Sequence, residues 1–287
     1  MAIPTDYIFQ SGTCQKKEIY DLMINKLVAA GWVDVSSKPA TDYVVLTSTG
    51  NTGDKALVLN LRDTNNSGAN SVKTTIYNTM SYRLQDSYVP GTNGNAGTFG
   101  RPTLAWSTLD IAPTSVNAGQ LAPDTTITYK VYADASKIIL ALEYPIATGF
   151  SPLLLYIGQP DSVYVAESAA KGMVVATTVN APAVSSLFIS NAPDGMGTTA
   201  APYVMPTTAL LPLRNPNAAG KYFESDILYQ SNTEGIRGKL NGVLCLLNSN
   251  IATGDIVTID TKTYYALVCH AQGYSSFLTQ ALLIRTA

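Results

Sequence analysis

The sequence is poor in charge. Only 13% of its 287 residues are charged, about half the usual share for globular proteins. The formal net charge is −2, and Lys and Arg form no cluster of the kind that neutralises phosphates in a nucleic-acid groove. No apolar run approaches the roughly 20 residues that a membrane-spanning helix needs. We therefore expect no direct nucleic-acid binding and no membrane span.

Groups for metal and nucleophilic chemistry are also scarce. His270 is the single histidine, which excludes HExxH and other multi-histidine metal sites. A Ser-His-Asp triad would have to use His270, but the chain has no GxSxG motif, since the second glycine is missing after Ser151. Cys269 and His270 form no dyad, because neighbours along a strand point to opposite faces. We expect no catalytic residue, no metal site and no cofactor.

The chain also lacks the marks of secretion. Its first ten residues, MAIPTDYIFQ, contain neither the basic segment nor the long apolar segment of a signal peptide. The cysteines, Cys14, Cys245 and Cys269, are odd in number and form no CxxC pair or zinc-finger spacing. These features predict three reduced thiols in a protein made in a cytoplasm.

Paired carboxylates are the chemistry that the sequence excludes least well. Glycoside hydrolysis needs only two Asp or Glu side chains that flank a cleft, and Glu143 and Asp226 are the best-placed candidates. We favour the simpler interpretation that each lies on an exposed strand face or caps a turn. The 17 tyrosines could form a sugar-stacking platform or serve sheet surfaces and protein interfaces. A glycosidase and a glycan-recognition module therefore stay open as alternatives.

The clearest structural pattern is the stretch 42–61, DYVVLTSTGNTGDKALVLNL. Apolar residues alternate with polar or small ones on both sides of a Gly-Asn-Thr-Gly-Asp turn, which predicts a β-hairpin. Gly50 and Gly53 can supply the positive φ that a tight connection needs. The turn lacks the glycine spacing and the Gly-Lys-Ser/Thr of a phosphate loop, so we expect it to be structural.

One amphipathic helix is predicted over residues 15–30, where apolar residues recur at helical spacing. Thr13 is a plausible N-cap, and Gly31 is a plausible stop signal. Trp32 follows at once and is expected to anchor the helix against the first sheet rather than to contact a ligand.

Further strands follow from runs of β-branched and aromatic residues. Residues 85–101 form a glycine-rich segment without a nucleotide-binding fingerprint, predicted to be a long surface loop and a candidate contact surface. Short strand-like pieces are expected at 172–179 and 186–190. Clear strands are expected over 72–84, 125–132, 137–144, 153–158, 240–247, 255–260, 263–269 and 280–285.

These elements predict an α+β fold, mostly β, in four parts. Residues 1–14 are expected to form an extended leader, and residues 15–165 a helix packed on an antiparallel sheet of about five or six strands. Residues 166–220 are rich in proline and are expected to form an irregular connector or arm. Residues 221–287 are expected to form a small all-β domain, sandwich-like or barrel-like.

Several short motifs follow one another in a defined order. After the helix come Gly-Trp, DYVVLTSTGNTGDKALVLNLRD, KVYADASKIILALEYP and LLLYIGQPDSVY, and later GIRGKLNGVLCL and GDIVTIDTKTYYALV. Over residues 15–164 and 235–268 this order resembles a group of tailed-bacteriophage virion proteins, whereas residues 166–220 match no part of it. The resemblance implies a non-enzymatic subunit of the tail, baseplate or neck–collar.

The resemblance also implies partners and a location. Such subunits assemble as symmetric homo-oligomeric rings in the host cytoplasm and contact other tail or neck proteins in the virion. A surface covered by neighbouring subunits can be poor in charge, which agrees with the composition. In the same setting, the alternative is a host-surface glycan-recognition module of the phage tail.

Overall fold

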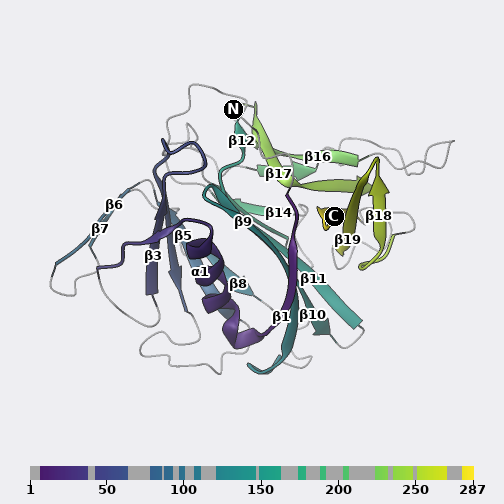
Figure 1. Cartoon of the computed structure of the whole chain (residues 1–287), viewed down its shortest axis with the longest axis horizontal. Helices are drawn as coiled ribbons and strands as arrows, with labels where there is room; N and C mark the ends of the chain where they lie inside the picture. The colour runs from purple at the N-terminus through teal and green to yellow at the C-terminus, as the bar shows by residue number, and fades with distance from the viewer. Residues whose placement is uncertain are drawn as a thin grey trace.

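The chain folds into antiparallel β-sheets with one α-helix among the residues that the structure describes (Figure 1), which confirms the predicted α+β, mostly β class. The structure is a computed structural model. It describes residues 7–37, 43–63, 78–85, 87–92, 97–100, 107–110, 121–146, 149–162, 174–178, 188–191, 203–206, 224–231, 235–247, 251–269 and 280–287.

A six-stranded central sheet forms the middle layer. Its two longest strands are β10 (Lys137–Ile146) and β11 (Gly149–Gly158), and both contain near-continuous apolar runs that are buried on either face. Such runs are typical of strands covered on both sides. The order of the sheet is β1 (Gln10–Gln15), β9 (Thr126–Asp134), β10, β11, β13 (Val174–Thr178) and β14 (Phe188–Asn191).

One face of the central sheet is covered by α1 and by a second, five-stranded sheet. Ile138 and Leu155 of the central sheet share a hydrophobic core with Met23 of the helix and with Leu59 of the second sheet. The single sheet predicted for residues 15–165 is therefore wrong, because its strands divide between two layers. The second sheet consists of β2 (Val33–Asp34), β3 (Tyr43–Ser48), β4 (Leu57–Arg62), β5 (Asn78–Gln85) and β8 (Ser107–Asp110).

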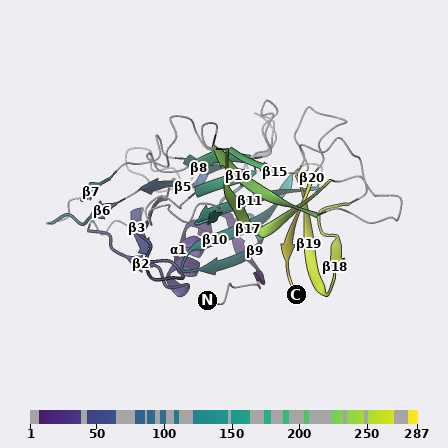
Figure 2. The ribbon, with the colours of Figure 1, turned by 90° about the horizontal axis from the view of Figure 1, so that it is seen from above.

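The other face of the central sheet is covered by the C-terminal sheet (Figure 2). Ile139 and Leu154 pack there against Cys245 and Leu282. The C-terminal sheet has the order β15 (Tyr203–Pro206), β16 (Glu224–Ser231), β17 (Gly235–Leu247), β20 (Gln280–Arg285), β19 (Lys262–Cys269) and β18 (Ile256–Ile259), and β12 (Asp161–Ser162) also pairs with β17.

The predicted helix is confirmed, but its start differs. A 3-10 turn over Lys16–Glu18 precedes α1 (Ile19–Ala29). Thr13 is not the cap, because it lies in β1 opposite Thr128. Instead, the Gln15 backbone N–H donates to the Glu18 carboxylate at 2.7 Å. Residues 10–15 pair with β9 as strand β1, so the helix begins later than the local sequence predicts.

The end of the helix follows the prediction. Gly31 has a φ of +96°, a left-handed conformation that glycine adopts without strain and that ends helices. Trp32 is buried in the core between α1 and the sheets, and its indole N–H donates to the Asp134 carbonyl at 3.0 Å. Trp32 therefore anchors the end of the helix to the turn between β9 and β10, as predicted.

The hairpin predicted over 42–61 is confirmed by β3 and β4, which pair from Tyr43–Arg62 to Ser48–Leu57. Gly50 and Gly53 have φ values of +69° and +77°. The turn also packs on the turn between β9 and β10, because the Asn51 backbone N–H donates to Ser136 Oγ at 2.9 Å. Two turns that are distant in sequence thus support one another.

Other predictions are met in part. The strands expected over 240–247, 255–260, 263–269 and 280–285 are confirmed, while β16 was not predicted. The glycine-rich segment 85–101 is not an open loop throughout, since β6 (Tyr88–Val89) pairs with β7 (Thr98–Phe99). Within 166–220 only β13, β14 and β15 are described. His270, residues 1–6 and most of the first half of the strand expected over 72–84 lie outside the described residues.

Candidate functional site

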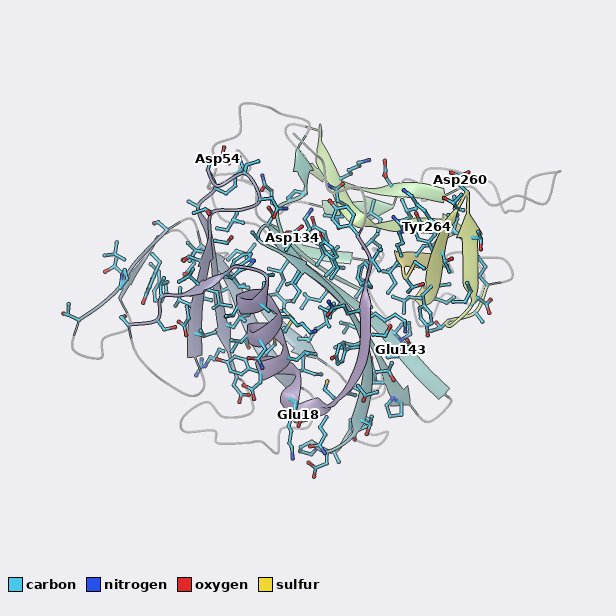
Figure 3. The ribbon with its side chains drawn as sticks, in the orientation of Figure 1. Glu18, Asp54, Asp134, Glu143, Asp260 and Tyr264 are labelled. Carbon is cyan, nitrogen blue, oxygen red and sulfur yellow. The ribbon has the colours of Figure 1, made fainter. Side chains whose placement is uncertain are left out.

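The candidate carboxylate Glu143 lies between the central sheet and the C-terminal sheet (Figure 3). It belongs to β10, and its side chain points to the same face as Ile139 and Ala141, which pack against the C-terminal sheet. Only 14% of the side chain is exposed. A carboxylate in such a position needs a cation or hydrogen-bond donors to compensate for its lost hydration.

Two residues supply that compensation, and sequence reasoning identified neither. Lys130 of β9, with 9% of its side chain exposed, places Nζ 3.3 Å from Glu143 Oε1. The Tyr265 hydroxyl of β19 lies 2.8 Å from both carboxylate oxygens and donates to the carboxylate. Lys130 Nζ also lies 3.5 Å from the centre of the Tyr265 ring, a cation–π contact. We call Lys130, Glu143 and Tyr265 the inter-sheet clamp.

Each member of the inter-sheet clamp contacts the other two. Burial, together with the hydrogen bond to Glu143, raises the pKa of the Tyr265 hydroxyl, so this group keeps its proton. Lys130 balances the charge of Glu143, and both carboxylate oxygens are engaged. Among the residues that the structure describes, no group of three His, Cys, Asp or Glu could hold a metal ion. The clamp ties two sheets together through one neutralised charge pair.

The second candidate carboxylate, Asp226, belongs to a different site. It lies in β16, and its Oδ2 is 3.3 Å from Nζ of Lys239 in the neighbouring strand β17. Both side chains are about half exposed, so this is a surface ion pair of small energetic weight. Glu143 and Asp226 thus pair with different lysines in different sheets, and no hydrogen bond joins them within the described part of the chain.

A second polar cluster lies at the turn between β9 and β10. The Asp134 carboxylate accepts hydrogen bonds from the backbone N–H groups of Ser136 at 2.7 Å and Lys137 at 3.0 Å, and from the Tyr132 hydroxyl at 2.9 Å. Burial, with Asp134 nearby, raises the pKa of Tyr132. The Tyr132 ring meets the ring of Tyr7 edge-on, with centroids 4.8 Å apart. The Asp134 carboxylate thus holds the turn between β9 and β10, while its backbone carbonyl holds Trp32.

A small groove lies where the last turn of α1 meets β1 and β9. Its volume is about 230 Å³, below the usual size of a small-molecule site. The groove is lined by three alanines, Ile8 and Val131, with Lys26, Gln10 and Tyr132 as the members that carry polar groups. The Lys26 amine donates to the Gln10 side chain at 2.9 Å. With one bound amine and no carboxylate, the lining offers no acid–base pair.

The remaining candidates are mostly parts of the core. Cys14 and Cys245 are free thiols, as predicted. Burial, reinforced by the negative charge of Glu18, raises the pKa of Cys14 to about 11, opposite to the shift of a reactive cysteine. Four of the described tyrosines are buried and cannot form a sugar platform: Tyr20, Tyr82, Tyr144 and Tyr156.

No helix in the described part of the chain has both the length and the apolar character needed to cross a membrane.

Comparison with known proteins adds no family: no protein-family model matches the chain, and no curated protein matches it significantly.

Proposed function

We propose that this chain is a non-enzymatic structural subunit of a tailed-bacteriophage particle, in the tail, baseplate or neck–collar region. It acts by assembling with copies of itself into a ring and by contacting other virion proteins, and it is assembled in the host cytoplasm. The order of the sequence motifs supports the phage assignment. The engaged state of Glu143 and Asp226 supports a role without catalysis.

The observation that carries the assembly role is the position of exposed aliphatic side chains. Val33 in β2, Val89 in β6 and Ile256 in β18 are 58%, 64% and 60% exposed. Among the described strands, β2 and β18 are borders of their sheets, and the β6–β7 hairpin projects at one side of the molecule, with Phe99 in contact with Arg83 of β5 (Figure 2). Border strands with apolar side chains and unpaired backbone groups are suited to contacts with other chains.

The proposal gives the less regular parts of the chain a role in the ring. Residues 166–220 act as an extended Pro-rich arm that lies along a neighbouring subunit, anchored to its own subunit by β13, β14 and β15. The strands of residues 221–287 contribute through the C-terminal sheet, which they form together with β12 and β15 and which covers the central sheet. Contacts of this heterologous kind close into a ring when the rotation between subunits divides a full turn.

The test is to look for the chain in the particle. We expect mass spectrometry of purified virions to identify the chain in several copies, and a cryo-EM map to place it in a ring. Val89→Thr should lower incorporation because it removes the apolar contact, whereas Val89→Ile keeps it and serves as the matched control. A stable monomer that is absent from purified virions would refute the proposal.

The alternatives make different predictions. A glycan-recognition module would bind defined glycans on an array and would lose that binding when its exposed tyrosines are replaced by alanine. A glycosidase that used the two candidate carboxylates would lose activity with Glu143→Gln or Asp226→Asn. We expect no hydrolysis that depends on either carboxylate.

A further inference from the structure

The outer edge of β1 contains a short stretch of unpaired backbone. In an antiparallel ladder, alternate residues turn their N–H and C=O groups to opposite sides. One residue after β1, the Lys16 N–H donates to the Thr125 carbonyl at 2.9 Å, so the even-numbered residues of β1 face β9. Ser11 and Thr13 therefore turn their backbone groups away from β9, and both side chains are exposed.

The outward positions on either side of this stretch are already occupied. The Phe9 N–H donates to the Arg285 carbonyl at 2.9 Å, and the Gln15 N–H donates to the Glu18 carboxylate at 2.7 Å. Between them, the outward groups of Ser11 and Thr13 have no hydrogen-bond partner among the described residues. We call residues 11–13 the open window of β1.

We propose that the open window pairs antiparallel with the open window of a second copy of the chain, about a two-fold axis through Gly12. This inference rests on the proposed self-assembly and adds a two-fold contact to the heterologous contacts of the ring; by itself this contact closes as a dimer. In this pairing Ser11 of one copy and Thr13 of the other exchange two backbone hydrogen bonds, and symmetry doubles them to four. Gly12 meets Gly12 in a close pair, with Cα atoms about 4.5 Å apart.

The pattern of occupied groups selects this register. With Gly12 on the axis, Phe9 faces Gln15 of the second copy, and both N–H groups already have partners within their own chain. A shift of two residues would set Thr13 against Phe9, whose N–H is taken by Arg285. The window is thus complementary to itself in one antiparallel register.

Charge favours a second copy as the partner. The sequence of β1, QSGTCQ, contains no charged residue, so identical strands do not repel one another, and it lacks the lysine or proline that commonly protects an edge strand. Lys26 is bonded to Gln10 at the start of β1, and Glu18 lies at its end (Figure 3). Antiparallel pairing brings the Lys26 end of each copy to the Glu18 end of the other, where the charges of Lys16, Lys17, Glu18 and Asp124 balance, so the pairing sets no excess of like charge together.

A designed disulfide tests the register. Position 10 faces Cys14 of the second copy in a non-hydrogen-bonded pair, where Cβ atoms lie about 4.5–5.5 Å apart. Within one chain the two positions are about 13 Å apart along the strand, too far for a disulfide. With oxidised glutathione as the oxidant, we expect Gln10→Cys to give a covalent dimer on a non-reducing gel. Gln10→Cys combined with Cys14→Ser is the matched control and should give no covalent dimer on the same gel.

A pair of charge variants tests the same contact without a covalent cross-link. Ser11→Glu combined with Thr13→Glu places like charges opposite one another across the axis, whereas Ser11→Glu combined with Thr13→Lys places opposite charges there. Within the chain, position 11 lies opposite Lys130. Both variants carry Ser11→Glu, so any effect of this substitution on its own chain is the same in both. By sedimentation velocity we expect the dimer of the first variant to be at least about tenfold weaker than that of the second.

The outcomes separate this inference from the proposed function. Equal association of the two charge variants, or a cross-link that persists without Cys14, would show that the window does not pair with itself. If wild-type protein forms no dimer but is found in virions, the window contact is wrong and the virion role stands. If the wild-type protein dimerises through the window but is absent from virions, the window contact stands and the virion role is wrong. If the window binds a strand of another virion protein instead, the second copy is the wrong partner.

Discussion

Removal of one hydroxyl from the inter-sheet clamp should measurably loosen the C-terminal sheet. Tyr265→Phe keeps the ring over Lys130 but deletes the donor that lies 2.8 Å from both oxygens of Glu143. A hydrogen bond to a charged group contributes roughly 1.5–3 kcal/mol, and Glu143 is too buried for water to replace it freely. We expect the free energy of unfolding, measured with urea and far-ultraviolet circular dichroism, to fall by about that amount.

Matched variants make this prediction specific. Tyr129→Phe deletes a hydroxyl that makes no hydrogen bond with the described residues. It should lower the free energy of unfolding by less than about 0.5 kcal/mol. Lys130→Met leaves the carboxylate without its cation and should cost about 3–5 kcal/mol. A double-mutant cycle of Tyr265→Phe with Glu143→Gln should give a coupling of about 1 kcal/mol or more. Equal costs for the two Tyr→Phe variants, or no coupling, would refute the clamp.

Three further predictions follow from single residues. Gly158→Ala should lower the free energy of unfolding by at least about 2 kcal/mol, since a Cβ at this position would clash with the Ser136 carbonyl oxygen. Gly53→Ala, where a Cβ would meet no atom, should lower it by only about 1 kcal/mol in the same urea assay. Because the folded state raises the pKa of Tyr265, it holds that proton more tightly than the unfolded chain, so stability should fall as the pH rises above about 10, and less steeply in Tyr265→Phe. Cys14, with its pKa raised to about 11, should react with iodoacetamide at pH 8 at least about tenfold more slowly in the folded than in the urea-unfolded protein, as followed by mass spectrometry.

Strands could be predicted where the residues of neighbouring segments carry the pattern themselves. Alternating residues and glycine-containing turns predict β3 with β4, and aromatic and β-branched runs predict β9 with β10; both pairs are confirmed. The layering was not predictable from these patterns. The uninterrupted apolar runs of β10 and β11 are typical of strands with two buried faces, but the segments that cover them lie far away in sequence. The periodicity of each strand shows which residues share a face, but it does not show to which of the two layers the strand belongs.

The candidate site shows the same limit. Glu143 was identifiable as a charge inside an apolar strand. Lys130 carried a comparable signal, a lysine within TTITYKVY, but the sequence does not show that the two side chains share a face. Tyr265 is 122 positions from Glu143, and only the packing of one sheet on another brings its hydroxyl to the carboxylate. Thr13 failed as a helix cap for a related reason, since pairing with β9 decides its conformation.

The hydrogen bond from Phe9 to the Arg285 carbonyl has a consequence for biosynthesis. Until residue 285 has left the ribosome, the start of the chain lacks this partner, and the face of β10 that carries Ile139 and Ala141 lacks part of its cover. Contacts between such distant segments form slowly and leave apolar surface accessible in the meantime. We therefore expect this face of β10 to stay partly uncovered in the nascent chain until β20 pairs with β17.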